Sequence, residues 1–157
     1  MFTSKSTTGM FLVMQGQNGT FWPIHWYARR QKCVSRSTTE AETVALAEGA
    51  YEDALPSMFL LDAILPSVSI PLVVLEDNQA VIQVVEKGFS VKLRHLPRTQ
   101  RLSIAALSEI YSQGQHFLRY VESAKQLADI LTKALERQKF VAARHAIGLQ
   151  PYATKGH

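Results

Sequence analysis

The sequence predicts a single α/β domain, and three observations lead to that prediction. An Asn18-Gly19 pair joins two apolar runs, which is typical of a β-hairpin. Residues 70–75 form a continuous apolar, β-branched run, as in a parallel strand buried on both faces, and an acidic turn and a helical segment follow it. Residues 41–50 are rich in good helix formers. We therefore expect a mixed sheet flanked by helices.

Composition and length narrow the class of protein. The chain has 157 residues, enough for one domain with one sizeable core. Hydrophobic residues make up 46% of it and charged residues 19%, a balance that argues against disorder of the whole chain. No run approaches the ~18 apolar residues of a membrane span, so we expect no membrane partner. The single cysteine, Cys33, excludes an internal disulfide and a thiolate metal cluster and fits a reducing compartment.

The remaining elements follow from periodicity and from helix-breaking residues. Pro23 removes one ladder donor from the second hairpin strand, which predicts an edge strand. Pro56 is expected to kink or end the helix that begins near Ser37, and a helical pattern resumes beyond it. Further helices are predicted at residues 79–87, 98–113, 126–135 and 138–147, a strand at 115–121, and a loose polar tail at the end.

The start of the first helix contains the first candidate site residue. Ser37 and Glu40 have the spacing of a capping box, in which the serine hydroxyl and the glutamate carboxylate each accept a free backbone N–H. If Glu40 serves the cap, Glu42 is left on a small, apolar helix face. A carboxylate there is costly without a metal, a proton or a partner. In the alternative, Thr39 is the cap and Glu42 is the glutamate of the box.

Three motifs together resemble one known family. Residues 37–42, 75–82 and 126–135, with the flanking segments 6–9, 32–37 and 140–149, resemble the ribonuclease H domain that closes the polyprotein of copia-type long-terminal-repeat retrotransposons. No single motif is specific, but their order and spacing together are. The resemblance covers Ser6 to Leu149. It implies a ribonuclease H-like domain over residues 1–149, followed by the polar tail 150–157.

The resemblance also implies a reaction and its cofactor. Glu42, Asp77 and Asp129 match three acids that hold two magnesium ions in this family, with manganese as a possible substitute. Such a centre hydrolyses the RNA strand of an RNA–DNA hybrid. Magnesium takes oxygen ligands and keeps several waters, and two ions stabilise the attacking water and the leaving oxygen. Histidine and cysteine ligands are not required.

Each acid also has a plainer interpretation. Asp77 has the position of an N-cap for the helix that begins near Asn78 or Gln79. Asp129 lies four residues before Lys133, the spacing of a solvated helical ion pair. Glu76 precedes Asp77 on the strand and is expected to face the opposite side, so it is left out of the site.

Nucleic-acid contacts are expected beside these acids. The formal charge is +4, and basic clusters at residues 29–36 and 87–101 flank the acidic motifs, although solvated loop charge is the alternative. By the resemblance, Thr38 and Thr39 approach the minor groove of a hybrid, Asn78 follows the second acid, and Lys92 and Arg94 lie on phosphates. The implied partners are an RNA–DNA hybrid and the reverse transcriptase portion of the same polyprotein, within a cytoplasmic virus-like particle or the nucleus.

One departure from the family bears on activity. The family's first acid lies on a strand before the segment matching residues 6–9, whereas this sequence has no Asp or Glu before Glu40. We therefore expect an N-terminally truncated member that lacks the central strand, with two open sheet edges beside the gap. A catalytically impaired relic that retains nucleic-acid binding or a structural role is the alternative. An integrase-like strand transferase is a third candidate, with a motif order that does not match.

Overall fold

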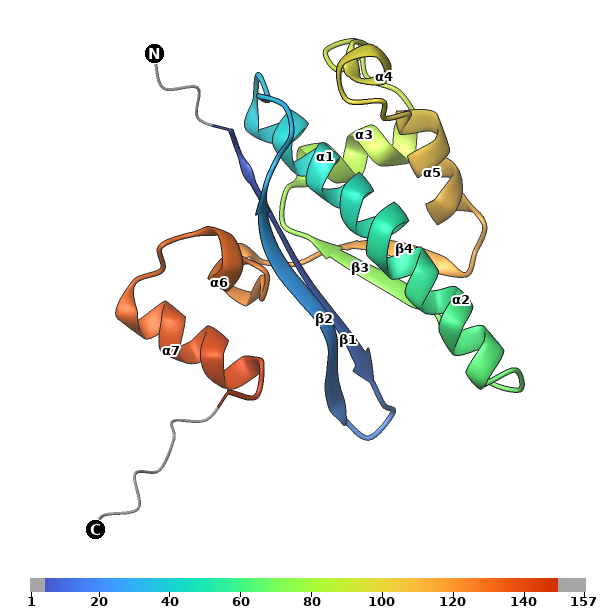
Figure 1. Cartoon of the computed structure of the whole chain (residues 1–157), viewed down its shortest axis with the longest axis vertical. Coiled ribbons are helices and arrows are strands. Elements are labelled where there is room, and N and C mark those ends of the chain that lie inside the picture. Colours follow the sequence, from blue (N-terminus) through green and yellow to red (C-terminus); the bar gives the residue numbers. More distant parts are fainter. Residues whose placement is uncertain (1–4, 150–157) are drawn as a thin grey trace.

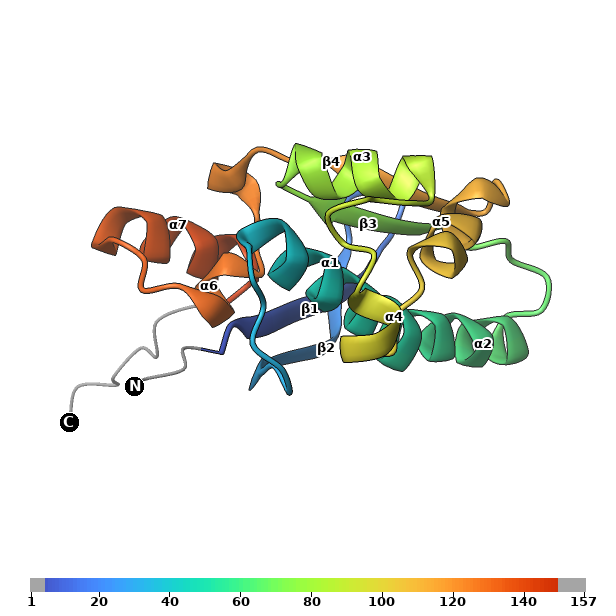
Figure 2. The same cartoon turned by 90° about the horizontal axis from the view of Figure 1, so that it is seen from above.

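Two small β-sheets and the helices around them make up residues 5–149, the part of the chain that the computed structural model describes (Figure 1). The elements in chain order are β1 (Thr7–Gln15), β2 (Phe21–Arg30), α1 (Thr38–Gly49), the π-helical turn η1 (Ala50–Ala54), α2 (Leu55–Ile64), β3 (Leu72–Glu76), α3 (Gln79–Lys87), α4 (Leu96–Thr99), α5 (Ile104–Ser112), β4 (His116–Tyr120), the 3₁₀ turn η2 (Ser123–Lys125), α6 (Asp129–Thr132) and α7 (Arg137–Ala146). The hairpin lies between the α6–α7 pair and the group of α3, α4 and α5 (Figure 2). The α/β class is confirmed, and the predicted polar tail lies outside the described residues.

The predicted hairpin is confirmed. β1 and β2 pair in antiparallel fashion, and Gly19 in the turn between them has a left-handed φ of 79°, which glycine adopts without steric cost. The register shifts so that Ile24 has no partner opposite it, next to Pro23. A bulge of this kind accommodates the missing proline N–H. Within the described residues β2 has no second neighbouring strand, as expected for an edge.

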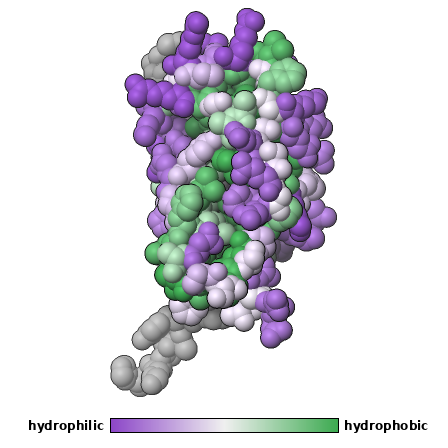
Figure 3. All heavy atoms as spheres, turned by 90° about the vertical axis from the view of Figure 1, so that its right-hand side faces the viewer, coloured by the Kyte–Doolittle hydropathy of each residue, from purple (hydrophilic) through white to green (hydrophobic). Residues whose placement is uncertain are grey.

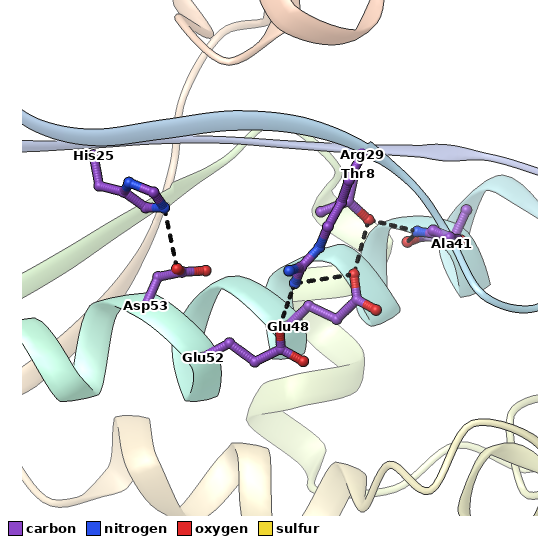
Figure 4. A network of polar contacts seen from close by, with 8 residues as sticks. Thr8, His25, Arg29, Ala41, Glu48, Glu52 and Asp53 are labelled. Carbon is purple, nitrogen blue, oxygen red and sulfur yellow. Dashed lines mark hydrogen bonds and ion pairs between the residues drawn. The ribbon is translucent and has the colours of Figure 1, made fainter.

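A polar network joins the hairpin to α1 (Figure 4). The Thr8 hydroxyl donates to the Glu48 carboxylate at 3.1 Å, and the Gln31 amide donates to the Thr8 hydroxyl at 3.1 Å and to the Ala41 carbonyl at 2.8 Å. Thr8 and Gln31 are 0% and 2% exposed. Buried polar groups are costly without partners, so this closed network fixes one position of the hairpin on the helix.

The helical segment that begins with α1 continues past Pro56. The Leu55 N–H donates to the Ala50 carbonyl, five residues earlier, in the π-helical turn η1. A proline ring collides with the carbonyl four residues before it in a regular α-helix, and the wider turn displaces that carbonyl. The irregularity predicted at Pro56 therefore takes the form of a π-helical turn, and α2 follows directly.

β3 and β4 form the second sheet, in parallel register from Leu72–His116 to Glu76–Tyr120. The predicted strands are confirmed, but burial of the first on both faces is wrong. Val73 and Leu75 are 41% and 50% exposed, because no described element covers that face. Instead of one mixed sheet, the described residues form two sheets, so β1 and β3 each have one edge without a neighbouring strand. Such edges can accept another strand.

The single helix predicted at residues 98–113 is wrong. α4 ends at Thr99 and α5 begins at Ile104. Between them, Arg101 has a left-handed φ of 54°, a conformation that breaks an α-helix. The Ser103 hydroxyl accepts the Ala106 N–H at 3.3 Å, which gives α5 its own N-cap.

The helix predicted at residues 126–135 is shorter than expected. Gln126 has an extended backbone, and its side-chain amide donates to the Leu75 carbonyl of β3 at 3.1 Å. The helix α6 begins only at Asp129, and Lys133 after it is extended again. A contact with the distant strand β3 therefore replaces the first helical turn. The last predicted helix is confirmed as α7.

The hydrophobic core lies between α1, α3, α4, α5 and one face of the β3–β4 sheet. Val81, Leu96 and Leu107 are fully buried in it. Burial of each such side chain contributes about 1.5–3 kcal/mol. This core fixes the N-terminal end of α1 beside the carboxyl end of β3, where the candidate site lies.

Helix α2 contributes nothing to that core, although most of its side chains are apolar. Phe59, Leu60 and Ile64 are 73%, 61% and 62% exposed, and apolar atoms gather in the lower half of Figure 3, where α2 lies. None of the described helices is long and apolar enough to cross a membrane. An apolar helix without a buried face leaves a surface open to another protein segment.

Gly9 of β1 provides a test of the contact between the hairpin and α6. A methyl group there would collide with the Thr132 side chain and lie 3.2 Å from the Ala128 carbonyl oxygen. Gly9→Ala should therefore lower the free energy of unfolding by about 1–3 kcal/mol, measured by denaturant titration. The control is Gly49→Ala, whose new methyl would meet only Met10 Cγ at 3.4 Å. Equal stability of Gly9→Ala and the wild type would contradict this close packing.

Candidate functional site

Helix α1 begins at the predicted capping box. The Ser37 hydroxyl accepts the Glu40 N–H at 3.1 Å. The Glu40 carboxylate accepts the Arg36 N–H at 3.0 Å and is 2% exposed. The alternative with Thr39 as the cap is wrong, so Glu42 does not serve the cap.

Glu40 also holds the segment between α3 and α4, residues 88–95, which we call the basic connector. His95 Nε2 lies 3.2 Å from Glu40 Oε1, and the two side chains are 22% and 2% exposed. Leu93 of the same segment is buried in the core, whereas Lys92 and Arg94 on either side of it are exposed. The connector therefore presents two cations to solvent while it is anchored on the start of α1.

Asn78 links the end of β3 to Glu42. Its side-chain oxygen accepts the Ala80 N–H at 2.9 Å as the N-cap of α3, and its side-chain nitrogen donates to the Glu42 carboxylate. The cap needs an acceptor, so the nitrogen is the atom that faces Glu42. Asn78 and not Asp77 caps α3, which makes the capping interpretation of Asp77 wrong.

Glu76 lies with these acids, although the sequence placed it on the other side of the strand. Its carboxylate accepts the Asn78 N–H at 3.0 Å. Burial above all, together with the negative charges of Glu42 and Asp77, raises the pKa of Glu76 to about 7 against the lowering effect of the Asn78 N–H. Side-chain alternation does not extend past Glu76, because β3 ends there and Asp77 lies in a bend. The one signal in the sequence that could have indicated Glu76 as a site residue is its position at the end of the strand.

Asp129 is the first residue of α6 and forms the predicted ion pair. Lys133 Nζ lies 2.8 Å from Asp129 Oδ1, and the two side chains are 53% and 16% exposed. The Gln126 contact with β3 and the close packing of Gly9 on α6 hold this segment against both sheets. Asp129 is therefore mostly buried although its lysine partner reaches solvent.

Lys133 connects the three acids that the separate motifs predicted. Burial lowers its pKa, but the hydrogen bond and charge of Asp129 outweigh that effect, and the charges of Asp77 and Glu42 add to it, so the pKa of Lys133 is raised. Glu42, Asp77 and Asp129 thus all act on one ammonium group. These three side chains come from α1, the end of β3 and α6.

Carboxylates supply oxygen ligands, which are the ligands that a magnesium ion prefers. The arrangement within residues 5–149 is different: no three His, Cys, Asp or Glu side chains there are grouped so that they could hold a metal ion by themselves. One of these acids, Asp129, is paired with the Lys133 ammonium at 2.8 Å. The oxygen ligands are thus suitable for a hard cation, but one of them has a lysine partner.

Three of the five residues predicted to contact nucleic acid line two neighbouring pockets. Thr39 and Lys92 line one pocket of about 450 Å³, together with Ser37, Gln83 and Lys87. Arg94 lines a neighbouring pocket of about 420 Å³. Thr38, the first residue of α1, is exposed and lines neither pocket, and Asn78 lies with Glu42 instead.

Comparison with known proteins finds a similarity to a retrotransposon polyprotein. Over 147 residues, 92% of this chain, the sequence is 27% identical to the retrovirus-related Pol polyprotein from transposon TNT 1-94 of Nicotiana tabacum. This similarity supports an origin in a retrotransposon Pol polyprotein. The chain spans 10% of that relative's length. No protein-family model and no solved structure matches the chain.

The pKa of Glu76 predicts a pH dependence of stability. The folded state retains a proton that the unfolded state releases, so the free energy of unfolding should fall as pH rises from 4.5 to about 7. This fall should be absent in Glu76→Gln. At pH 8 the free energy of unfolding of Glu76→Gln should be up to about 3 kcal/mol above that of the wild type, measured by denaturant titration in EDTA. Glu122→Gln, with an exposed carboxylate, is the control. If the difference in unfolding free energy between Glu76→Gln and the wild type were the same at pH 5 and pH 8, this role of Glu76 would be excluded.

Proposed function

We propose that this chain is a ribonuclease H-like segment of a retrotransposon Pol polyprotein, which hydrolyses the RNA strand of an RNA–DNA hybrid. The similarity to the tobacco polyprotein supports the Pol origin. The observation that favours this reaction is that hydrogen bonds join the three motifs at the end of β3. Asn78, next to Asp77, donates to the Glu42 carboxylate, and Gln126, three residues before Asp129, donates to the Leu75 carbonyl. Acids that are distant in sequence and are brought to one strand end are expected for a hydrolytic centre.

Glu42, Asp77 and Asp129 would hold the divalent ions, two Mg²⁺ with Mn²⁺ as a substitute. Such ions, when bound, supply an activated water and stabilise the leaving oxygen of the phosphodiester. The protein's own residues orient the acids. Asn78 holds the Glu42 carboxylate, and Gln126 holds the segment before Asp129 against the end of β3.

The proposed hybrid-binding face runs along the start of α1 and the basic connector. Lys92 and Arg94 are exposed cations for phosphates, and Thr38 and Thr39 lie at the first turn of α1. Contacts to 2′-hydroxyls in a wide, shallow minor groove are what distinguish RNA from DNA. The threonine hydroxyls are suited to such contacts. Asn78 directly follows the acid Asp77 in the sequence.

The proposed protein partner is the reverse transcriptase portion of the same polyprotein. The exposed apolar side chains of α2 are suited to burial against such a segment, because Phe59, Leu60 and Ile64 have no cover among the described residues. The site of action would be intracellular, in a virus-like particle or the nucleus.

The second candidate is a catalytically impaired segment that binds nucleic acid. Two observations favour it: the described residues form two sheets with open edges on β1 and β3, and they contain no group of acids that could hold a metal unaided. A strand between β1 and β3 is the place where the family's first acid is expected. Activity would then depend on a strand that carries that acid.

A cleavage assay separates these two candidates. The chain, extended at its N-terminus by a strand segment carrying an aspartate, should cleave a labelled RNA–DNA hybrid in Mg²⁺ at least about a hundredfold faster than the unextended chain, because misplacement of reacting groups by 1 Å costs roughly that much. Asp77→Asn in the extended chain should abolish cleavage. A folded, extended chain that binds hybrid without cleaving it would instead support the impaired segment.

Hybrid binding has its own test. Affinity should fall steeply with salt, and Lys92→Ala with Arg94→Ala should reduce the slope of log K against log salt by about 0.7–0.9 for each lost phosphate contact. Fluorescence anisotropy with a short hybrid measures this slope. The matched control is Lys125→Ala with Lys139→Ala, two cations outside the basic connector. An equal change in both double variants would exclude the connector as the phosphate-binding face.

A further inference from the structure

We propose that Phe89 and the cations on either side of it form a binding site for an unpaired nucleotide, with the base stacked on the Phe89 ring. The site goes beyond the proposed function, because its ligand is a single strand and not a duplex. It rests on that function in one respect, since Lys92 is also assigned to the hybrid-binding face.

Phe89 is an exposed aromatic residue within a basic segment. Its side chain is 65% exposed, and Val91 two residues later is 70% exposed. Lys87 precedes this pair and Lys92 follows it, and both lysines are exposed. Apolar side chains that lie in solvent within a polar rim mark interaction sites. The combination indicates a ligand with both an apolar surface and negative charge.

The exposure of Phe89 does not come from a loose loop. Gly88 ends α3 with a left-handed φ of 70°, and its N–H donates to the Val85 carbonyl at 3.0 Å. At the other end, the Leu93 N–H donates to the Ser90 carbonyl at 3.2 Å, and Leu93 is only 4% exposed. Both ends of the segment are therefore fixed, and the ring between them is held in solvent.

The two neighbouring pockets share Phe89 as a lining residue. Lys87 and Lys92 line the pocket of about 450 Å³, and Arg94 lines the pocket of about 420 Å³. Among the described residues that line either pocket, none is Asp or Glu. The site thus offers a ring face for a base and cations for its phosphates, without a carboxylate that would repel them.

An unpaired nucleotide suits this site better than a duplex or an apolar peptide does. Bases of a single strand stack on aromatic side chains while cations follow the backbone, and this mode tolerates any base sequence. A base inside a duplex is already stacked on both faces, so it has no face left for Phe89. An apolar peptide would leave Lys87, Lys92 and Arg94 without a complementary charge.

Fluorescence anisotropy with a labelled six-nucleotide single strand of DNA tests the stacking. Phe89→Ala should weaken binding roughly five- to hundredfold, the range for loss of one base–aromatic stack. The slope of log K against log salt should stay the same, because the ring carries no charge. Phe89→Trp should keep the wild-type affinity.

The matched control is Phe59→Ala, which removes a ring of similar exposure, 73%, from α2. It should change the affinity for the single strand less than twofold. No loss in Phe89→Ala, or an equal loss in both variants, would overturn the proposal.

A strand without bases separates stacking from phosphate binding. A six-nucleotide strand of abasic sugars keeps its charge but cannot stack, so the wild type should bind it more weakly than the intact strand. Phe89→Ala should bind the two strands with nearly equal affinity, because the base and the ring act as a coupled pair. Equal affinity of the wild type for the two strands would overturn the proposal.

A blunt RNA–DNA hybrid distinguishes this site from the proposed function. Phe89→Ala should change hybrid affinity less than twofold. An equal loss on hybrid and single strand would overturn the proposal, because Phe89 would then support the connector as a whole. Failure of the extended chain to cleave the hybrid, with single-strand binding still dependent on Phe89, would overturn the ribonuclease function alone.

Discussion

The contact between the Asn78 amide and the Glu42 carboxylate is the interaction on which the candidate site depends. One side chain serves two elements, because its oxygen caps α3 while its nitrogen reaches α1. The same residue donates its backbone N–H to Glu76. The end of β3, the start of α3 and the first turns of α1 therefore hold one another in place. Loss of the amide would release a helix end and leave a carboxylate without its donor.

Interacting charged side chains at the carboxyl end of β3 shift one another's pKa values. Glu76 has a pKa of about 7 because it is buried beside Glu42 and Asp77. Lys133 offsets part of that charge from α6. Such clusters of shifted pKa values are typical of functional sites. In this protein the cluster lies at the end of β3, a strand with a single neighbouring strand among the described residues.

The two halves of the structure differ in how they are stabilised. The α1, α3 and α5 half has a continuous apolar core with fully buried Val81 and Leu107. The hairpin depends instead on the polar network of Thr8, Gln31 and Glu48 and on close packing of Gly9 against α6. Loss of a network partner leaves a buried polar group unpaired, whereas truncation of a core side chain leaves a cavity. The hairpin therefore contacts both sides of the candidate site, since Gln31 bonds to the Ala41 carbonyl of α1 and Gly9 packs against the α6 segment.

Local sequence determined the hairpin at Asn18-Gly19, the cap at Ser37 and the parallel strand that ends at Glu76, because turn chemistry, capping and periodicity act within a few residues. Tertiary contacts decided the rest. The Gln126 side chain bonds to β3 and shortens α6, and the left-handed Arg101 divides one predicted helix into two. Only the folded chain brings Glu76 to Glu42 and Lys133 to three acids, since charge interactions depend on distance in space and not on distance in sequence.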